Sequence, residues 1–345
     1  MKYRCFASLL IMLGLAVLGA SGALAQATSG NRPFNGFAVQ FRLAWEMPLP
    51  DPVKLIEIGQ VTAEKHNSLL MLVGGKDRND ARRKLLITHW DGFKFATDFS
   101  TEFLGNNILD VLLVGHFRTA SSLPKPAKGK ASPPVAQQIV TTEGIYEWTG
   151  GTFARLFESP TDTKLAILLE KSPDQLLTGA GDKAIAYEVG DKDVHPSAGE
   201  PPEDGNGYVR FGVGTQDFPG AEALALVPGV RYAQSFWSNR NKWMIGLLRG
   251  KPAGLPDYPN ATVGDRLVVY VPKFGSRDKT FWGCRTEDLE EAWRSEPLPG
   301  RVLDVRVGDP KNEGKDGILV LTAQNNDQER HLYFFTVAQG MLGGR

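Results

Sequence analysis

The chain has 345 residues with 39 basic and 39 acidic side chains, so its formal net charge at pH 7 is zero. Proteins that bind nucleic acids rely on clusters of basic side chains to neutralise phosphates, and the sequence has no such cluster. We therefore expect no nucleic-acid partner. The 42% of hydrophobic residues are enough to build a large core.

Residues 1–25 have the features of a secretory signal peptide. Lys2 and Arg4 precede an apolar run, and an Ala-Leu-Ala cleavage site ends at Ala25. Glycines interrupt the apolar run, which is too short to span a bilayer, and no other segment is apolar for long enough. We expect a periplasmic or extracellular protein with no membrane span after cleavage of the signal peptide.

Residues 26–345 are predicted to form a single all-β domain made of repeats. Three segments share an alternating strand that ends at glycine, a polar loop, and an apolar strand whose Leu or Ile stands ten positions after that glycine. The three strand-end glycines are Gly59, Gly214 and Gly308. Less regular copies have strand ends near positions 115, 170 and 250, which gives a period of about 50 residues. This period is typical of a four-stranded propeller blade.

A second pattern, Trp-x-Gly-x-x-Phe-x-x-x-Phe, occurs from Trp90 to Phe99 and again from Trp148 to Phe157. In each copy we expect the Trp to end the third strand, the Gly to form a tight turn, and the first Phe to lie on the fourth strand. Asp-Gly and Gly-Gly are favoured in such hairpin turns. The aromatic side chains are predicted to pack between neighbouring sheets, so the motif indicates an architecture.

The two ends of the chain are predicted to share one blade. Residues 37–59 resemble residues 292–308, and the C-terminal segment supplies a third strand without a fourth. An N-terminal strand can fill that place, which closes the ring and removes open sheet edges. We expect a closed β-propeller of six four-stranded antiparallel blades, with seven blades as the alternative.

Two segments interrupt the repeat, at about 119–136 and at about 190–207. Both are rich in proline and charged residues, a composition that favours an extended chain outside the core. We interpret them as tolerated surface insertions, with contact arms for a partner as the alternative.

The segment GDPKNEGKDGILV, residues 308–320, resembles the G-D-F-N-G-D-G-K-D-D-L-x-V signature of FG-GAP and VCBS repeats, which form integrin-like propeller blades. The resemblance implies a secreted propeller that acts as an interaction module or as part of an enzyme, and many members bind calcium in this loop. Calcium needs six to eight oxygen ligands, but Lys311 and Gly317 stand at two of the ligand positions. Asp309 and Glu313 remain as a degenerate ligand set. We expect a hydrogen-bonded Asx-type turn and no cofactor, with calcium as the alternative.

The sequence contains no His or Cys spacing typical of a metal site, no phosphate-binding loop and no Gly-x-Ser-x-Gly elbow. We therefore favour a non-catalytic interaction scaffold with a protein or polysaccharide partner. The alternatives are a lectin-like propeller that binds carbohydrate and a hydrolase or lyase on the same fold. The candidate ligand-binding residues combine flat apolar faces with amide and guanidinium donors, although packing between blades is the alternative role for the tryptophans. These candidates are Trp237, Asn239, Arg240, Asn241 and Trp243.

Overall fold

The computed structural model confirms the all-β prediction. It describes residues 33–34, 37–38, 40–62, 66–75, 80–105, 110–118, 136–160, 166–169, 173–178, 185–190, 192–198, 233–234, 242–248, 264–272, 289–325 and 328–337. These residues form strands, turns and irregular connections, with no helix among them. Within the same ranges, no helix exists that has the length and apolar character needed to cross a membrane.

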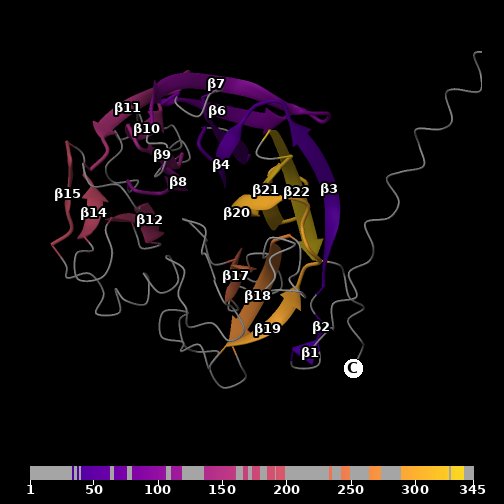
Figure 1. The fold of residues 1–345 in the computed structure, drawn as a ribbon. Coiled ribbons are helices and arrows are strands. Elements are labelled where there is room, and N and C mark those ends of the chain that lie inside the picture. Colours follow the sequence, from indigo (N-terminus) through magenta and orange to yellow (C-terminus); the bar gives the residue numbers. More distant parts are fainter. Residues whose placement is uncertain are drawn as a thin grey trace, which may run out of the picture.

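The strands form five four-stranded antiparallel sheets and one small two-stranded ribbon (Figure 1). The first sheet contains β4 (Val53–Gly59), β5 (Ser68–Val73), β6 (Arg82–Trp90) and β7 (Phe95–Leu104). The second contains β8 (Leu112–Gly115), β9 (Gln138–Thr141), β10 (Gly144–Trp148) and β11 (Phe153–Glu158). The third contains β12 (Ala166–Leu169), β13 (Gln175–Thr178), β14 (Ile185–Val189) and β15 (Val194–Pro196).

The fourth sheet contains β16 (Ala233–Gln234), β17 (Lys242–Leu248), β18 (Arg266–Pro272) and β19 (Leu289–Arg294). The fifth contains β20 (Arg301–Gly308), β21 (Gly317–Gln324), β22 (Glu329–Val337) and β3 (Phe41–Leu49). The ribbon pairs β1 (Pro33–Phe34) with β2 (Phe37–Ala38). In the first four sheets the strands are neighbours in chain order, as expected of antiparallel meanders, whereas in the fifth sheet β3 pairs with β22.

The fifth sheet joins the two ends of the chain, as the sequence predicts. Its outer strand β3 comes from the N-terminal side and runs antiparallel to β22, with Trp45 opposite Phe334. Trp45 and Trp293, which come from the two similar segments 37–59 and 292–308, both lie on the outer strand of their sheets.

Neighbouring sheets share buried apolar cores. The fourth sheet packs on the fifth, the fifth on the first, the first on the second, and the second on the third. In Figure 1 these sheets follow one another along an arc, and β4, β8, β12 and β20 lie on its inner side. Burial of continuous apolar surface between sheets is the main force that holds such repeats together.

The two Trp-Gly-Phe hairpins fold as predicted. Trp90 ends β6 and pairs with Phe95, while Trp148 ends β10 and pairs with Phe153. Each pair of rings lies with centroids 5.1 Å apart. Phe99 of the first sheet also contacts Phe153 of the second, with ring centroids 5.1 Å apart. The motif therefore packs between neighbouring sheets.

The strand-end glycines have a steric cause. A Cβ added to Gly59 would overlap Val114 and the side chain of Gln137 in the next sheet. A Cβ added to Gly308 would lie 3.1 Å from the Cγ2 atom of Ile58, again in the next sheet. The equal spacing read from the sequence thus marks places where sheets approach closely. Gly214 lies outside the described residues.

A pair of hydrogen bonds between sheets recurs beside two strand-end glycines, Gly59 and Gly115. The N–H of Gln60 donates to the side-chain oxygen of Gln137 at 2.8 Å, and the N–H of Gln137 donates back to the Gln60 carbonyl at 2.8 Å. His116 and Asp174 make the same two bonds, at 2.6 and 2.9 Å, between the second and third sheets. These bonds connect the first sheet to the second and the second sheet to the third.

Substitution of Gly59 by alanine is expected to lower the free energy of unfolding by about 1–3 kcal/mol, because the new methyl group overpacks the interface between two sheets. Gly151→Ala is the matched control, since a Cβ there meets no atom within 4 Å. Urea unfolding followed by tryptophan fluorescence measures both changes. Equal stability of the two variants would show that the close approach at Gly59 has no steric role.

The two predicted insertions are described only in part. Residues 119–135 lie outside the described residues. Of the segment predicted at about 190–207, residues 190 and 192–198 are described, and they include β15. The prediction of a loop over this whole segment is therefore wrong, because residues 194–196 form the outer strand of the third sheet. Pro196 makes this segment look unlike a strand in the sequence. An edge strand nevertheless tolerates proline, because one side of the strand makes no ladder bonds.

Candidate binding surface

The binding residues predicted from the sequence are mostly not described. Trp237, Asn239, Arg240 and Asn241 lie outside the described residues. Trp243 lies in β17, where its backbone is opposite Ala233 of β16. The proposed role of these five residues therefore stays a prediction.

The loop between β20 and β21 forms the predicted Asx-type turn. The Asp309 carboxylate accepts the backbone N–H of Gly314 at 2.6 Å and that of Lys315 at 3.2 Å. Asn312 and Gly314 have positive φ values of 58° and 75°, which this tight path requires. Within the described part of the chain, no group of three or more His, Cys, Asp or Glu side chains is arranged to hold a metal ion.

Two other acids of this loop take no part in the turn. Glu313 is exposed to solvent. The pKa of Asp316 is raised, first by burial and then by the negative charge of Asp309.

Lys311, from the same loop, lies between two tryptophans. Its Nζ atom is 3.8 Å from the centre of the Trp90 ring and 4.5 Å from that of Trp45. Burial lowers the pKa of Lys311, against the opposite effect of Glu313. A cation over two aromatic faces is attracted to both rings. Lys311 therefore bridges the fifth sheet to the first.

Aromatic rings continue on both sides of this cation. Trp45 stacks on Phe334 with centroids 5.1 Å apart, and Trp90 meets Phe95 edge to face. The rings of Trp45 and Phe95, in neighbouring sheets, lie 6.4 Å apart. These side chains form a continuous seam that ends at the hairpin between β6 and β7.

Phe93 stands at the tip of that hairpin with 91% of its surface exposed. The turn below it is held by Asp91, whose Oδ1 atom accepts the N–H groups of Phe93 and Lys94, each at 2.8 Å. These backbone bonds lower the pKa of Asp91, with the bond from Lys94 first. Gly92 supplies a φ of 101°. The ring is therefore carried on an ordered turn.

The next hairpin provides an internal comparison. Its turn has the same geometry, with Thr149 N–H donating to the Thr152 carbonyl at 2.9 Å and Gly150 at a φ of 94°. Counted from the tryptophan, Gly151 stands where the first hairpin has Phe93. Since the second turn forms without an aromatic residue, the fold does not require Phe93.

Lys311 also differs from the residue at the equivalent position of the first sheet. Three residues after the strand-end glycine, the fifth sheet has Lys311 and the first sheet has Thr62. In the sequence, Lys311 stands out only as a residue that cannot ligate calcium, and Trp90 only as part of the repeated hairpin motif. A comparison of equivalent repeat positions is the signal that would have indicated both Lys311 and Phe93.

Two histidines of the first sheet and its loop lie beside each other. His66 and His89 have ring centroids 6.3 Å apart, and the Nδ1 atom of His89 is 2.6 Å from a carboxylate oxygen of Asp98. Next to His66, Asn67 donates its backbone N–H to the Asn312 side chain at 2.6 Å. The two histidines are 23 positions apart in the chain, and the fold brings their rings together.

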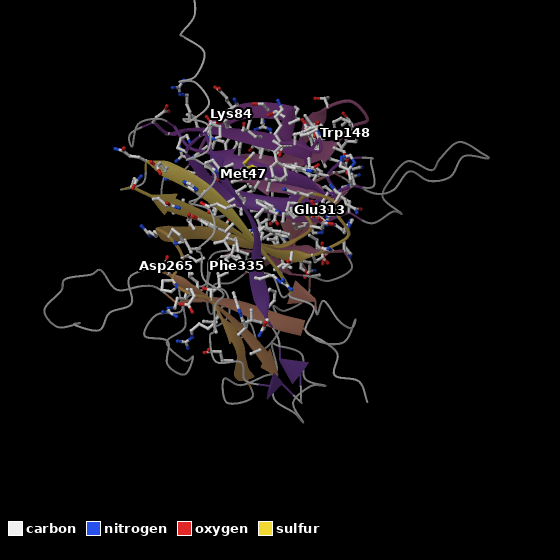
Figure 2. The ribbon with its side chains drawn as sticks, turned by 90° about the vertical axis from the view of Figure 1, so that its right-hand side faces the viewer. Met47, Lys84, Trp148, Asp265, Glu313 and Phe335 are labelled. Atoms are coloured by element: carbon white, nitrogen blue, oxygen red, sulfur yellow. The ribbon has the colours of Figure 1, made fainter. Side chains whose placement is uncertain are left out.

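We call the surface formed by Trp45, Trp90, Phe93 and Lys311 the aromatic edge. Figure 2 shows that Trp148 of the second hairpin and Glu313 of the β20–β21 loop lie toward the same side of the molecule, with Asp265 on the opposite side. The second hairpin and the β20–β21 loop thus lie on the same side of the molecule.

Comparison with known proteins does not identify a family. No family model matches the chain, and no curated protein sequence matches it. Among solved structures, the crystal structure of the S. cerevisiae core factor has 9% sequence identity and a TM-score of 0.25, over 86% of this chain and 49% of that chain. The present chain thus spans about half the length of that one. A similarity of this size carries no argument about fold or function.

Proposed function

We propose that the sheets are blades of a closed propeller of the FG-GAP or VCBS type. The packing of five sheets in order and the sheet shared by both chain ends support this proposal. Six blades, rather than seven, remain our expectation. The repeat unit predicted at residues 209–229, around Gly214, lies outside the described residues.

On this propeller, we propose a non-catalytic interaction scaffold that binds a protein partner in the periplasm or outside the cell. The observation that carries the proposal is Phe93, which is exposed at a hairpin tip where the equivalent hairpin has Gly151. An exposed ring on an ordered turn loses little conformational freedom when it is buried by a partner. Aromatic side chains of this kind are enriched among the residues that dominate binding energy.

Phe93→Gly is expected to weaken partner binding about ten- to a hundredfold, since burial of a Phe side chain contributes about 1.5–3 kcal/mol. The variant reproduces the residue of the second hairpin, so the turn is expected to fold. A partner would be captured by a photocrosslinking residue at position 93, identified, purified, and titrated by calorimetry against wild type and variant.

Leu104→Ser is the matched control for this experiment. Leu104 is 76% exposed at the other end of β7, so the change removes exposed apolar surface away from the hairpin tip. The control is expected to keep the wild-type dissociation constant. Equal affinity of wild type and Phe93→Gly would contradict the proposal, and glycan binding without a protein partner would favour the lectin alternative.

A further inference from the structure

Three charged side chains are buried where the first sheet meets the fifth. Glu57 lies on β4, and Asp304 and Arg306 lie on β20, each with at most 2% of its surface exposed. The Nε atom of Arg306 donates to Glu57 at 3.1 Å, and its Nη1 atom donates to Asp304. One guanidinium is therefore shared by two carboxylates from two sheets.

Backbone bonds hold the same carboxylates across the interface. Asp304 accepts the N–H of Ile56 from the neighbouring sheet at 2.9 Å and the N–H of Val305 at 2.9 Å. Glu57 accepts the N–H of Ile58 at 3.0 Å. Ile56 and Asp304 are 248 positions apart in the chain, so this cluster ties the sheet that contains both chain ends to the sheet that follows it.

The environment of Asp304 favours its neutral form. Burial raises the pKa of Asp304 to about 7, and the negative charge of Glu57 acts in the same direction, while Arg306 and the backbone N–H groups oppose them. The adjacent strand β21 carries no charged residue. Asp265, before β18, bonds instead to the backbone N–H of Val302. Among the described residues, Glu57 and Arg306 are the charged side chains that act on the Asp304 carboxyl group.

We propose that Glu57, Asp304 and Arg306 form a pH-responsive latch between the fifth and first sheets. When Asp304 takes up a proton, Arg306 compensates Glu57 alone, and the cost of a second buried negative charge disappears. The interface is therefore tighter in mild acid than above neutral pH.

The direction in which stability changes with pH follows from the protons that Asp304 binds in the folded and in the unfolded protein. The unfolded chain releases the Asp304 proton near pH 4, whereas the folded protein keeps it to about pH 7. The contribution of Asp304 protonation to the stability of the folded protein is complete below pH 4 and is lost as the pH rises through 7. Within that window, this one group raises the unfolding constant by up to about tenfold for each pH unit.

The test compares the full chain with Asp304→Asn at several pH values from 5 to 8. Urea unfolding gives global stability, and hydrogen exchange gives the protection factor of peptides that contain the Ile56 amide. For the wild type, we expect the protection factor to fall by about tenfold per pH unit up to pH 7. In Asp304→Asn the fall should be absent, because asparagine has no proton to lose.

Glu57→Gln provides a second variant that does not depend on the folding of Asp304→Asn. It removes a charge that raises the pKa of Asp304, so the pH at which protection is lost should shift downward. Glu102→Gln, on the exposed surface of β7, should keep the wild-type profile. A wild-type protection factor that is constant from pH 5 to 7, or equal slopes in wild type and Asp304→Asn, would overturn the proposal.

Discussion

Arg306→Met is expected to lower the free energy of unfolding by about 3–5 kcal/mol, the largest effect that we expect of any single polar substitution in this protein. Arg306 is the guanidinium that Asp304 and Glu57 share, and all three side chains are buried. Methionine fills much of the same volume but leaves the Asp304 carboxylate without its cation. The cost of an uncompensated buried charge exceeds what the pair contributes when it is complete.

The effect of Arg306→Met should also depend on pH. At pH 5 the Asp304 carboxyl is protonated and the loss of the cation matters less, whereas at pH 8 the full cost applies. The matched control is Arg82→Met, because Arg82 pairs with Asp80 at 2.9 Å on the surface. Surface ion pairs contribute little, so the control should stay within the error of urea unfolding. Similar losses in both variants, or a loss that does not grow with pH, would refute this account.

Much of the fold could be predicted because steric requirements leave periodic marks in the sequence. Gly59 and Gly308 recur at equivalent positions because a side chain at either would meet the next sheet. Trp90 and Trp148 recur because each ends a strand and contacts the Phe that opens the next one. Such constraints act within one repeat and its neighbour, so they repeat with the architecture.

The candidate site and the buried cluster could not be found by the same search, because both consist of departures from the repeat. Glu57 and Arg306 occupy the same repeat position, two residues before the strand-end glycine, where the second sheet has the buried Leu113. Opposite charges at equivalent interior positions of adjacent repeats would have indicated a pair between sheets. The third member, Asp304, gives no such signal, since its burial depends on packing between segments far apart in the chain.

The residues of the aromatic edge could not be predicted from periodicity either. Trp90 and Phe95 recur in the second hairpin, whereas Phe93 has no aromatic counterpart there and so leaves no periodic mark in the sequence. The contact of Lys311 with Trp45 and Trp90 joins three segments that are distant in sequence. Periodicity predicts which residues build the sheets, whereas function is better sought at exposed positions where equivalent units differ.

Phe334→Ala is expected to lower the free energy of unfolding by about 3–5 kcal/mol. Phe334 is 4% exposed and belongs to the core that the fifth sheet shares with the first. Its ring also stacks on Trp45, which lies under the Lys311 ammonium group. Truncation removes buried apolar surface and leaves a cavity next to the ring that supports the aromatic edge.

Replacing Phe93 by alanine tests whether the loss of stability in Phe334→Ala comes from the burial of the ring or from the loss of a phenylalanine as such. Phe93→Ala alters a ring that is 91% exposed, so its stability should change by less than about 0.5 kcal/mol. We therefore expect opposite outcomes from the two variants: Phe334→Ala loses stability, while Phe93→Ala stays stable and loses partner affinity. Chemical unfolding and partner titration on both proteins measure this difference. A large stability loss in Phe93→Ala would mean that the hairpin tip is a structural element, and the binding role proposed for it would then have to be abandoned.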